Sequence, residues 1–315
     1  MIDLHVAGVV TLALLVDVTM GDPPNRFHPV AWMGNAIAIA RRITPASGES
    51  VRFFCGMGLV FGGIAVVGSV GWAIQRLCRD SPFLVSIVVQ AIVLKCMFSV
   101  SALATAGKLV GGALRRQNLE LARHHVATHL VSRDVSKLGE PKLAAATIES
   151  VAENTSDSVI APLFYFAIAG LPGALLYRFV NTCDAMIGYR TPELEWFGKT
   201  AARTDDLLNW MPSRITAVLM LIVGGIRTGR FRNPIAIWIR DHRLTASPNA
   251  GHPMSAAAGV LGVVLEKEEH YILGNGQPDP CTVTIEQAIR LLWDTSLAGA
   301  VLLALAATVW EWTKT

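Results

Sequence analysis

The residues best suited to chemistry lie between positions 146 and 214. This stretch opens with Glu149, Glu153 and Asp157, which recur every four residues. If the segment is helical, the three carboxylates share one stripe, where each neighbouring pair repels by about 0.2–0.5 kcal/mol. A counter-cation would relieve this repulsion, and either Mg²⁺ or nearby arginines would serve.

Three further polar clusters follow in the same stretch. Any single cluster is ordinarily explained as a solvated helix end. Several clusters that combine acids, amides and guanidinium groups within an otherwise apolar chain favour a binding or catalytic site instead. Their members are Asn181, Asp184, Arg190, Arg203, Asp205, Asp206, Asn209 and Arg214.

Two candidate regions lie earlier in the chain. Residues 21–29 contain Asp22 and His28 among three prolines and a glycine, so they form a turn that no helix can continue through. Lys95 lies in the middle of an apolar segment, where a lysine costs about 3 kcal/mol in lipid. We therefore expect Lys95 to face the protein interior and to pair with an acid or a ligand phosphate.

Composition indicates a membrane protein. Of the 315 residues, 52% are hydrophobic and 16% are charged, whereas soluble domains carry about 25% charged residues. The net charge of +3 suits anionic lipid headgroups or phosphorylated ligands and is too small to indicate nucleic acid. Five scattered cysteines without a C-x-x-C pair argue against a disulfide framework and a zinc site.

These residues must be positioned by apolar helices. We predict an all-α, multi-pass membrane protein that forms a single domain over residues 1–315, with polar helical insertions at about 108–157 and 230–296. Glycines in the second apolar segment allow close helix packing. Five or six apolar segments are counted, at 4–20, 53–74, 83–107, 159–177, 215–226 and 297–310.

The central segment at 159–177 is expected to be broken or re-entrant. It is long enough to cross a bilayer, but Pro162, Gly170, Pro172 and Gly173 interrupt it. The distribution of Lys and Arg places loops 21–52 and 108–157 in the cytoplasm. Strict alternation would then send the Asp205 loop to the other side, so a single polar site requires one central segment that does not simply cross.

Several motifs together resemble the adenosylcobinamide-phosphate synthase family of cobalamin biosynthesis (CobD/CbiB). The matching text is GDPP at 21–24, HPV at 28–30, VSRD at 131–134, IESVAENTSD at 148–157, NTCDAMIGYR at 181–190, ARTDDLLN at 202–209 and SPNAG at 247–251. After SPNAG the chain continues with His252, whereas the family typically has an aromatic residue followed by an acid. The fine shape of this part of the pocket is therefore expected to differ.

The resemblance implies a carbon–nitrogen ligase in the cytoplasmic (inner) membrane, with its active site facing the cytoplasm. Such an enzyme uses ATP to join the carboxylate of (adenosyl)cobyric acid to aminopropanol or its O-phosphate, giving (adenosyl)cobinamide or its phosphate. The partners expected are the corrinoid, the aminoalcohol or its phosphate, membrane lipid, other late cobalamin-pathway membrane enzymes and further copies of the chain. Nucleic acid is not expected.

Amide formation from a free carboxylate requires an activated oxygen, most simply an acyl phosphate, and phosphoryl transfer needs a metal and cationic clamps. The chain has no Walker A motif, so ATP must bind another scaffold. Candidate Mg²⁺ ligands are Glu149, Glu153, Asp157, Asp184, Asp205 and Asp206. Glu149, Glu153, Asp205 and Asp206 are also catalytic candidates, together with Asp22 and His28, either of which is the candidate general base. Candidate substrate and phosphate contacts are Lys95, Arg133, Asn154, Asn181, Arg190, Arg203, Asn209, Arg214 and Asn249.

Three other functions fit part of the pattern. A non-catalytic, AmpE-like membrane sensor or regulator of the same superfamily has no evident chemical reason to keep the acid and arginine set. A membrane prenyltransferase would use Asn181 and the Asp205–Asp206 pair to hold Mg²⁺-diphosphate, but such enzymes need more crossings. A transporter would explain Lys95 and the broken segment, but no inverted repeat is visible.

Overall fold

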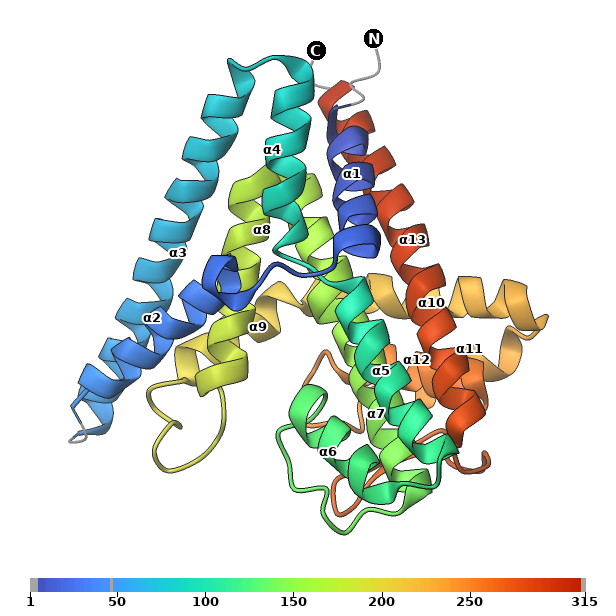
Figure 1. Cartoon of the computed structure of the whole chain (residues 1–315). Coiled ribbons are helices and arrows are strands. Elements are labelled where there is room, and N and C mark those ends of the chain that lie inside the picture. The colour runs from blue at the N-terminus through green and yellow to red at the C-terminus, as the bar shows by residue number, and fades with distance from the viewer. Residues whose placement is uncertain (1–4, 46–47, 313–315) are drawn as a thin grey trace. The chain divides into compact units, whose positions relative to one another are not determined.

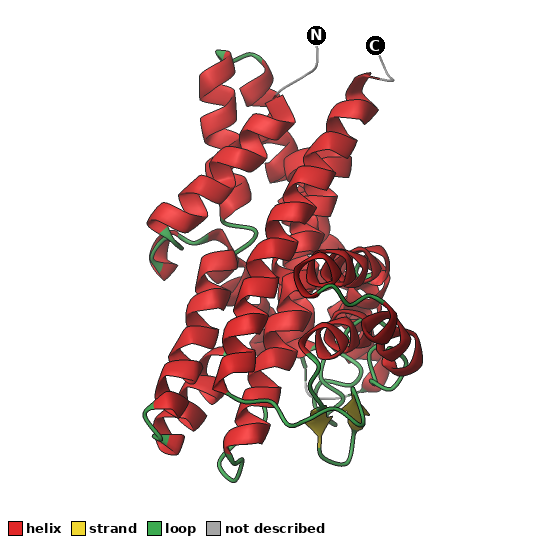
Figure 2. Cartoon of the chain, turned by 90° about the vertical axis from the view of Figure 1, so that its right-hand side faces the viewer, coloured by secondary structure: helices red, strands yellow, loops and turns green. Residues whose placement is uncertain are grey.

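The computed structural model describes residues 5–45 and 48–312. Within these residues the chain is almost entirely helical, and the strands form one short antiparallel hairpin (Figures 1 and 2). The all-α class is therefore confirmed.

The helices follow one another in chain order with short connections. They are α1 His5–Met20, α2 Pro29–Ile43, α3 Glu49–Arg79, α4 Phe83–Lys95, α5 Val100–Arg115, α6 Leu119–His129, α7 Glu140–Thr155, α8 Ala161–Ile187, α9 Lys199–Leu208, α10 Trp210–Thr228, α11 Arg232–Asp241, α12 Gly251–Leu261 and α13 Thr282–Trp312. A 3₁₀ turn spans Asn25–Phe27 (η1), and a π-helical turn spans Ser156–Ile160 (η2). The hairpin strands are β1 Leu265–Lys267 and β2 Tyr271–Leu273.

Four helical segments among the described residues are long and apolar enough to cross a membrane. They are Glu49–Arg79, Phe83–Arg115, Glu140–Ile187 and Thr282–Val309. The bent pair formed by α9 and α10 adds a fifth if it counts as one span. Helix α1 is apolar but has only 16 residues. The multi-pass membrane class is confirmed, with four or five spans of sufficient length.

The contacts divide the chain into two compact units whose segments interleave along the sequence. The first unit comprises Met1–Ser99, Ala161–Asn209 and Ala300–Thr315, and the second comprises Val100–Ile160 and Trp210–Gly299. The expectation of a single domain over residues 1–315 stays a prediction.

In the first unit, α3 packs along α8 and α1 packs along α4. Glycines make the α3–α8 contact possible. A Cβ atom on Gly63 would lie 2.0 Å from the Phe179 ring, and one on Gly71 would lie 2.8 Å from the backbone of Pro172. Because only hydrogen fits at these positions, the two helices approach more closely than larger side chains would permit.

Helix α8 is interrupted as the sequence predicts. Gly170 has φ 64° and ψ −150°, a conformation that is strained for any residue with a Cβ atom, and Pro172 follows two residues later. The break frees the backbone N–H of Leu171, which donates to Oε1 of Gln75 on α3 at 3.1 Å. A side chain from the neighbouring helix thus satisfies a group that the break would otherwise leave unpaired.

Two expectations about element boundaries were wrong. The apolar segment 83–107 was expected to be one continuous span, but residues 96–99 separate α4 from α5. The backbone turns there through tighter hydrogen bonds, such as the one from the Met97 N–H to the Leu94 carbonyl at 2.9 Å. Part of the predicted polar insertion, residues 108–115, belongs to α5.

In the second unit, α10 and α11 pack on α12, and α5 packs on α6 and α7. The hairpin is held at the end of β2 by Asp241 of α11. The Asp241 carboxylate accepts a hydrogen bond from the Gly274 N–H at 2.7 Å and two more from the Arg240 guanidinium. The hairpin packs against α7, so its side chains reach the acidic face of that helix.

Candidate functional site

The predicted site residues divide between the two units. The first unit holds Asp22, His28, Lys95, Asn181, Asp184, Arg190, Arg203, Asp205, Asp206 and Asn209. The second unit holds Arg133, Glu149, Glu153, Asn154, Asp157, Arg214 and Asn249. Within each unit several of these residues form clusters, and the idea that all of them meet in one pocket stays a prediction.

Lys95 ends α4 inside the protein, with a side chain that is only 2% exposed. Its ammonium group pairs with the Asp17 carboxylate of α1 at 2.9 Å and with the Asp22 carboxylate in the turn that follows α1. Ser99 donates a hydrogen bond to the other oxygen of Asp22 at 3.0 Å. The expectation that Lys95 faces inward and pairs with an acid is confirmed, and its contact with a phosphate stays a prediction.

His28 stands beside this cluster and begins α2. Its Nδ1 accepts a hydrogen bond from the Val30 N–H at 3.2 Å, so the proton of the neutral ring lies on Nε2. Burial lowers the pKa of His28, and the positive charges of Lys95 and Arg178 lower it further, whereas Asp22 opposes the shift. His28 is thus a neutral Nε2–H donor in this arrangement, and its role as a general base stays a prediction.

Asp205 of α9 lies in a buried hydrogen-bond network of the first unit. Its carboxylate accepts hydrogen bonds from the Asn209 amide at 2.9 Å and from the Asn181 amide at 3.3 Å. The Tyr177 hydroxyl in turn donates to Oδ1 of Asn209 at 2.8 Å. These bonds fix the orientation of both amides, so three predicted residues from two helices share one network.

Two further carboxylates surround Asp205. Asp184, near the end of α8, and Asp206 both act on it electrostatically, and they act on one another. Like charges held this closely near a protein interior favour the binding of a cation. The sequence thus correctly suggested that the acids of segments 181–190 and 203–209 come together.

A cavity of about 220 Å³ opens beside Asp206. Arg190 and Arg203, both predicted, line it together with Lys199, and the charges of the two arginines act on Asp206. Lys199 lies 4.1 Å from the ring centre of Trp196, which holds its ammonium group in a cation–π contact. Three cations at one small cavity are suited to bind a phosphate or carboxylate group.

A second small cavity, of about 200 Å³, lies in the second unit between α7, the loop before it and the hairpin. Glu149 and Glu153 line it with Arg133, whose guanidinium contacts Oε2 of Glu149 at 3.3 Å. Oε1 of Glu149 is buried and has no hydrogen-bond partner among the described residues. This oxygen is therefore available to a ligand.

The hairpin adds two residues to this cavity that the sequence did not indicate, Lys267 and Tyr271. Burial raises the pKa of the Tyr271 phenol, and the nearby carboxylates of Glu149 and Glu153 raise it further. Tyr271 therefore stays protonated at neutral pH and can donate a hydrogen bond. No motif marks this short strand, which becomes part of the site only because it packs on α7.

The carboxylate stripe on α7 is interrupted before its third member. The helix changes to a π-helical turn at Ser156, which alters the angle between successive side chains. Glu149 and Glu153 line the cavity, whereas Asp157 is not among the residues found there. Asn154 is engaged locally, since its amide donates to the Ser150 carbonyl at 2.9 Å and its Oδ1 accepts from Ser158.

Arg214 and Asn249 also come together in the second unit. The Arg214 guanidinium lies 3.4 Å from Oδ1 of Asn249 and stacks on the ring of Trp210. The adjacent His252 is buried, and Trp238 donates its indole N–H to Nδ1 of His252 at 3.2 Å. Because the indole can only donate, Nε2 of His252 carries the proton.

The position where this chain departs from the family pattern is therefore a neutral histidine. Burial lowers the pKa of His252 to about 4, and the charges of Arg214, His242 and Arg243 contribute to the shift. His252 presents an N–H donor next to Arg214 at neutral pH. An anionic ligand at this place would meet a donor and a cation.

The carboxylates do not form a complete metal cage. Among the described residues, no three His, Cys, Asp or Glu side chains gather in an arrangement that could hold a metal ion. The pairs described above are the largest sets of acids that the cavities offer, with Glu149 and Glu153 at one cavity and Asp206 with Glu195 at the other.

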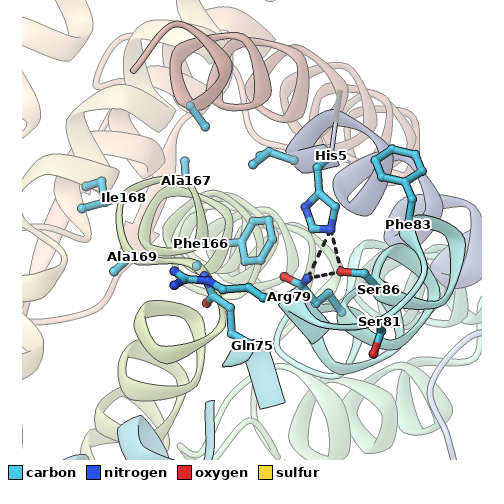
Figure 3. Close-up of a pocket in the computed structure, with 14 residues that line it drawn as sticks. His5, Gln75, Arg79, Ser81, Phe83, Ser86, Phe166, Ala167, Ile168 and Ala169 are labelled. Carbon is cyan, nitrogen blue, oxygen red and sulfur yellow. Dashed lines mark hydrogen bonds between the residues drawn. The ribbon is translucent and has the colours of Figure 1, made fainter. Parts of the chain in front are cut away.

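A larger cavity, of about 560 Å³, lies in the first unit and contains none of the predicted residues. Figure 3 shows His5 and Ser86 on one side of it and Gln75 and Arg79 on another. The His5 ring, the Ser86 hydroxyl and the Gln90 amide are joined by hydrogen bonds of 2.9–3.3 Å. This polar group connects α1 with α4, and Gln75 supports the break in α8.

Comparison with known proteins agrees with the resemblance seen in the sequence. A family model described as CobD/Cbib protein matches residues 10–292. The cobalamin biosynthesis protein CobD of Dehalococcoides mccartyi (strain CBDB1) is 40% identical over 302 residues, covering 93% of this chain and 96% of that protein. A probable cobalamin biosynthesis protein CobD of Methanothermobacter thermautotrophicus is 42% identical over 274 residues, covering 87% of each chain. No solved structure matches the chain.

Proposed function

The chain belongs to the CobD/Cbib family, and on this basis we propose that it joins the carboxylate of (adenosyl)cobyric acid to the amine of aminopropanol or its O-phosphate. The reaction consumes ATP, and the product is (adenosyl)cobinamide or its phosphate. The enzyme works in the cytoplasmic membrane with its site open to the cytoplasm. The proposal extends a role in cobalamin biosynthesis to one particular amide bond.

The observation that carries the proposal is the cavity lined by Arg190, Lys199 and Arg203 beside Asp206. A reaction that activates a carboxylate with ATP moves a phosphoryl group, whose charge must be held by fixed cations. Arginine binds phosphate through two parallel N–H groups and keeps its charge at any physiological pH. The cavity supplies two such groups and an ammonium group.

The chemistry proceeds in two steps. First, an oxygen of the corrinoid carboxylate attacks the γ-phosphorus of ATP, the bond from that phosphorus to the bridging oxygen breaks, and ADP leaves. Second, the amine nitrogen attacks the carbon of the acyl phosphate, inorganic phosphate departs, and the amine loses a proton. Arg190 and Arg203 would hold the transferred group, and the carboxylates nearby would orient the amine or accept its proton.

The acids fit Mg²⁺ only in the way that phosphoryl-transfer sites usually hold it. Mg²⁺ keeps several waters and takes one or two carboxylates together with substrate phosphates, so a cage of three acids is not required. Asp206 and Asp184 would contribute in the first unit, and Glu149 and Glu153 in the second. Bound with ATP, the metal would neutralise charge on the phosphates.

The test uses the full chain purified in detergent. It is incubated with cobyric acid, ATP, MgCl₂ and either aminopropanol, aminopropanol phosphate or ethanolamine, and the corrinoid product is identified by mass spectrometry. Arg203→Gln and Glu153→Gln are expected to lower the rate by at least about 100-fold, the usual effect of removing one group that stabilises the transition state. Glu120→Gln, an exposed acid of α6, is the matched control and is expected to keep the full rate.

The outcomes separate the alternatives. Wild-type turnover by Arg203→Gln and Glu153→Gln would remove both residues from the site. Corrinoid binding without ATP consumption by the unmodified chain would contradict the ligase and favour the non-catalytic regulator of the same superfamily.

A further inference from the structure

A cavity of about 470 Å³ in the second unit is lined by charged residues to which the proposed reaction gives no role. It lies between the end of α10 and the first half of α13, and α12 contributes Val260 to its floor. Gln287, Arg290 and Asp294 of α13 face it from one side, as expected for positions i, i+3 and i+7 of a helix.

The cavity is strongly basic. Arg227, Arg230 and Arg290 line it, and Asp294 is the one carboxylate among its described lining residues. Arg227 pairs with Asp294 at 2.5 Å, whereas the side chains of Arg230 and Arg290 make no ion pair or hydrogen bond within the described part of the chain. Two guanidinium groups thus remain available to an anion.

Apolar surface leads up to these arginines. The uncharged run 215–226 of α10 ends immediately before Arg227, and the uncharged run 295–309 of α13 begins immediately after Asp294. Both helices pass the test for membrane-spanning segments, α10 as part of the bent pair. On α10, the apolar side chains of Val218, Ile222 and Ile226 are 42%, 47% and 73% exposed, and their spacing of four residues makes a continuous stripe toward the cavity.

We propose that this cavity binds the headgroup of an anionic phospholipid, with an acyl chain lying along the exposed stripe of α10. The arginines stand where two apolar runs end, which is the depth of lipid phosphates in a bilayer. The phosphate would be held by Arg230 and Arg290 through paired N–H groups. A soluble anion would use the arginines but not the apolar stripe, so an amphipathic ligand fits the surface best.

The test measures lipid binding by native mass spectrometry of the full chain in detergent. Phosphatidylglycerol is titrated against the unmodified chain and against the double variant Arg230→Ala, Arg290→Ala. Each arginine near an anionic headgroup contributes about a fivefold gain in affinity, so the double variant is expected to bind about 30-fold more weakly. Both side chains are exposed, so their removal is not expected to affect folding.

A control and a variant of opposite sign sharpen the test. Arg116→Ala, Lys137→Ala also removes two exposed cations of the second unit, and it is expected to bind the lipid as the unmodified chain does. Asp294→Asn removes the carboxylate from the cavity and is expected to tighten binding about fivefold. The ion pair it breaks is partly exposed and contributes little to stability.

Three results would overturn the proposal. The first is unchanged phosphatidylglycerol affinity in the Arg230→Ala, Arg290→Ala variant. The second is equal binding of phosphatidylcholine with the same acyl chains, because the arginines would then not select anionic headgroups. The third is equal binding of glycerol 3-phosphate, which would identify a site for soluble phosphates instead of lipid.

Discussion

Among individual residues, Lys95 shows most directly how a charge is retained in an apolar protein. Its ammonium group lies between the carboxylates of Asp17 and Asp22, and Asp17 has no exposed surface. An isolated charge in such a place would lose several kcal/mol of hydration, which an opposite charge at contact distance can offset. The cluster also joins α4 to α1 and to the turn that carries Asp22 and His28.

Replacing Lys95 by Met should therefore destabilise the protein. The substitution leaves Asp17 and Asp22 without their cation, and breaking a buried pair from one side typically costs about 3–5 kcal/mol of unfolding free energy. Thermal unfolding in detergent, followed by tryptophan fluorescence, measures the effect.

Neutral carboxylates provide the control for this prediction. The triple variant Lys95→Met, Asp17→Asn, Asp22→Asn should be more stable than Lys95→Met alone, because no uncompensated charge remains buried. If Lys95→Met unfolds at the same temperature as the unmodified chain, the ion pairs do not support the fold in the way argued.

Among the elements, α3 separates its glycines into two groups. Gly56 and Gly63 face neighbouring chain segments, and a Cβ on Gly56 would lie only 1.9 Å from the Phe197 carbonyl. Gly58 and Gly62 have no such neighbour within 4 Å. Their abundance indicated close packing from sequence, but the sequence did not show which of them are in contact.

This separation predicts opposite effects of the same substitution. Gly56→Ala and Gly63→Ala should each lower the unfolding free energy by about 1–3 kcal/mol, since added atoms in a packed contact force neighbours to shift. Gly58→Ala and Gly62→Ala should be neutral or raise it by up to about 1 kcal/mol, because alanine favours the helix. Thermal unfolding of the four variants in one detergent decides between them, and equal effects in both pairs would contradict the packing described.

For the molecule as a whole, helix α3 shows how the membrane completes the fold. In its apolar span only 11% of the residues are buried by the protein. Side chains such as Phe54, Phe61 and Trp72 are more than half exposed, which in water would be a large apolar patch. Lipid therefore covers a surface that the chain leaves open.

The proposed chemistry requires the acidic segments of both units to open to the same compartment. Thr191, next to Arg190, and Lys137, in the loop that carries Arg133, are exposed positions suited to test this. Single cysteines placed there, in a chain whose five native cysteines are replaced by alanine, should react with a membrane-impermeant maleimide in inside-out vesicles and not in right-side-out vesicles. Labelling of the two positions from opposite sides would leave the reaction without a common site.

The sequence by itself determined the helical membrane class, the break at Gly170, the inward direction of Lys95 and the family, because these depend on residue type, hydropathy and local spacing. Only the tertiary structure identified Asp17 as the partner of Lys95, brought Tyr271 to Glu149, and placed Arg190 with Arg203 and Lys199 at one cavity. Such contacts join residues far apart in the chain, and many pairings satisfy the same hydropathy pattern. Packing between helices, which depends on the shapes of all the side chains at once, selects one of them.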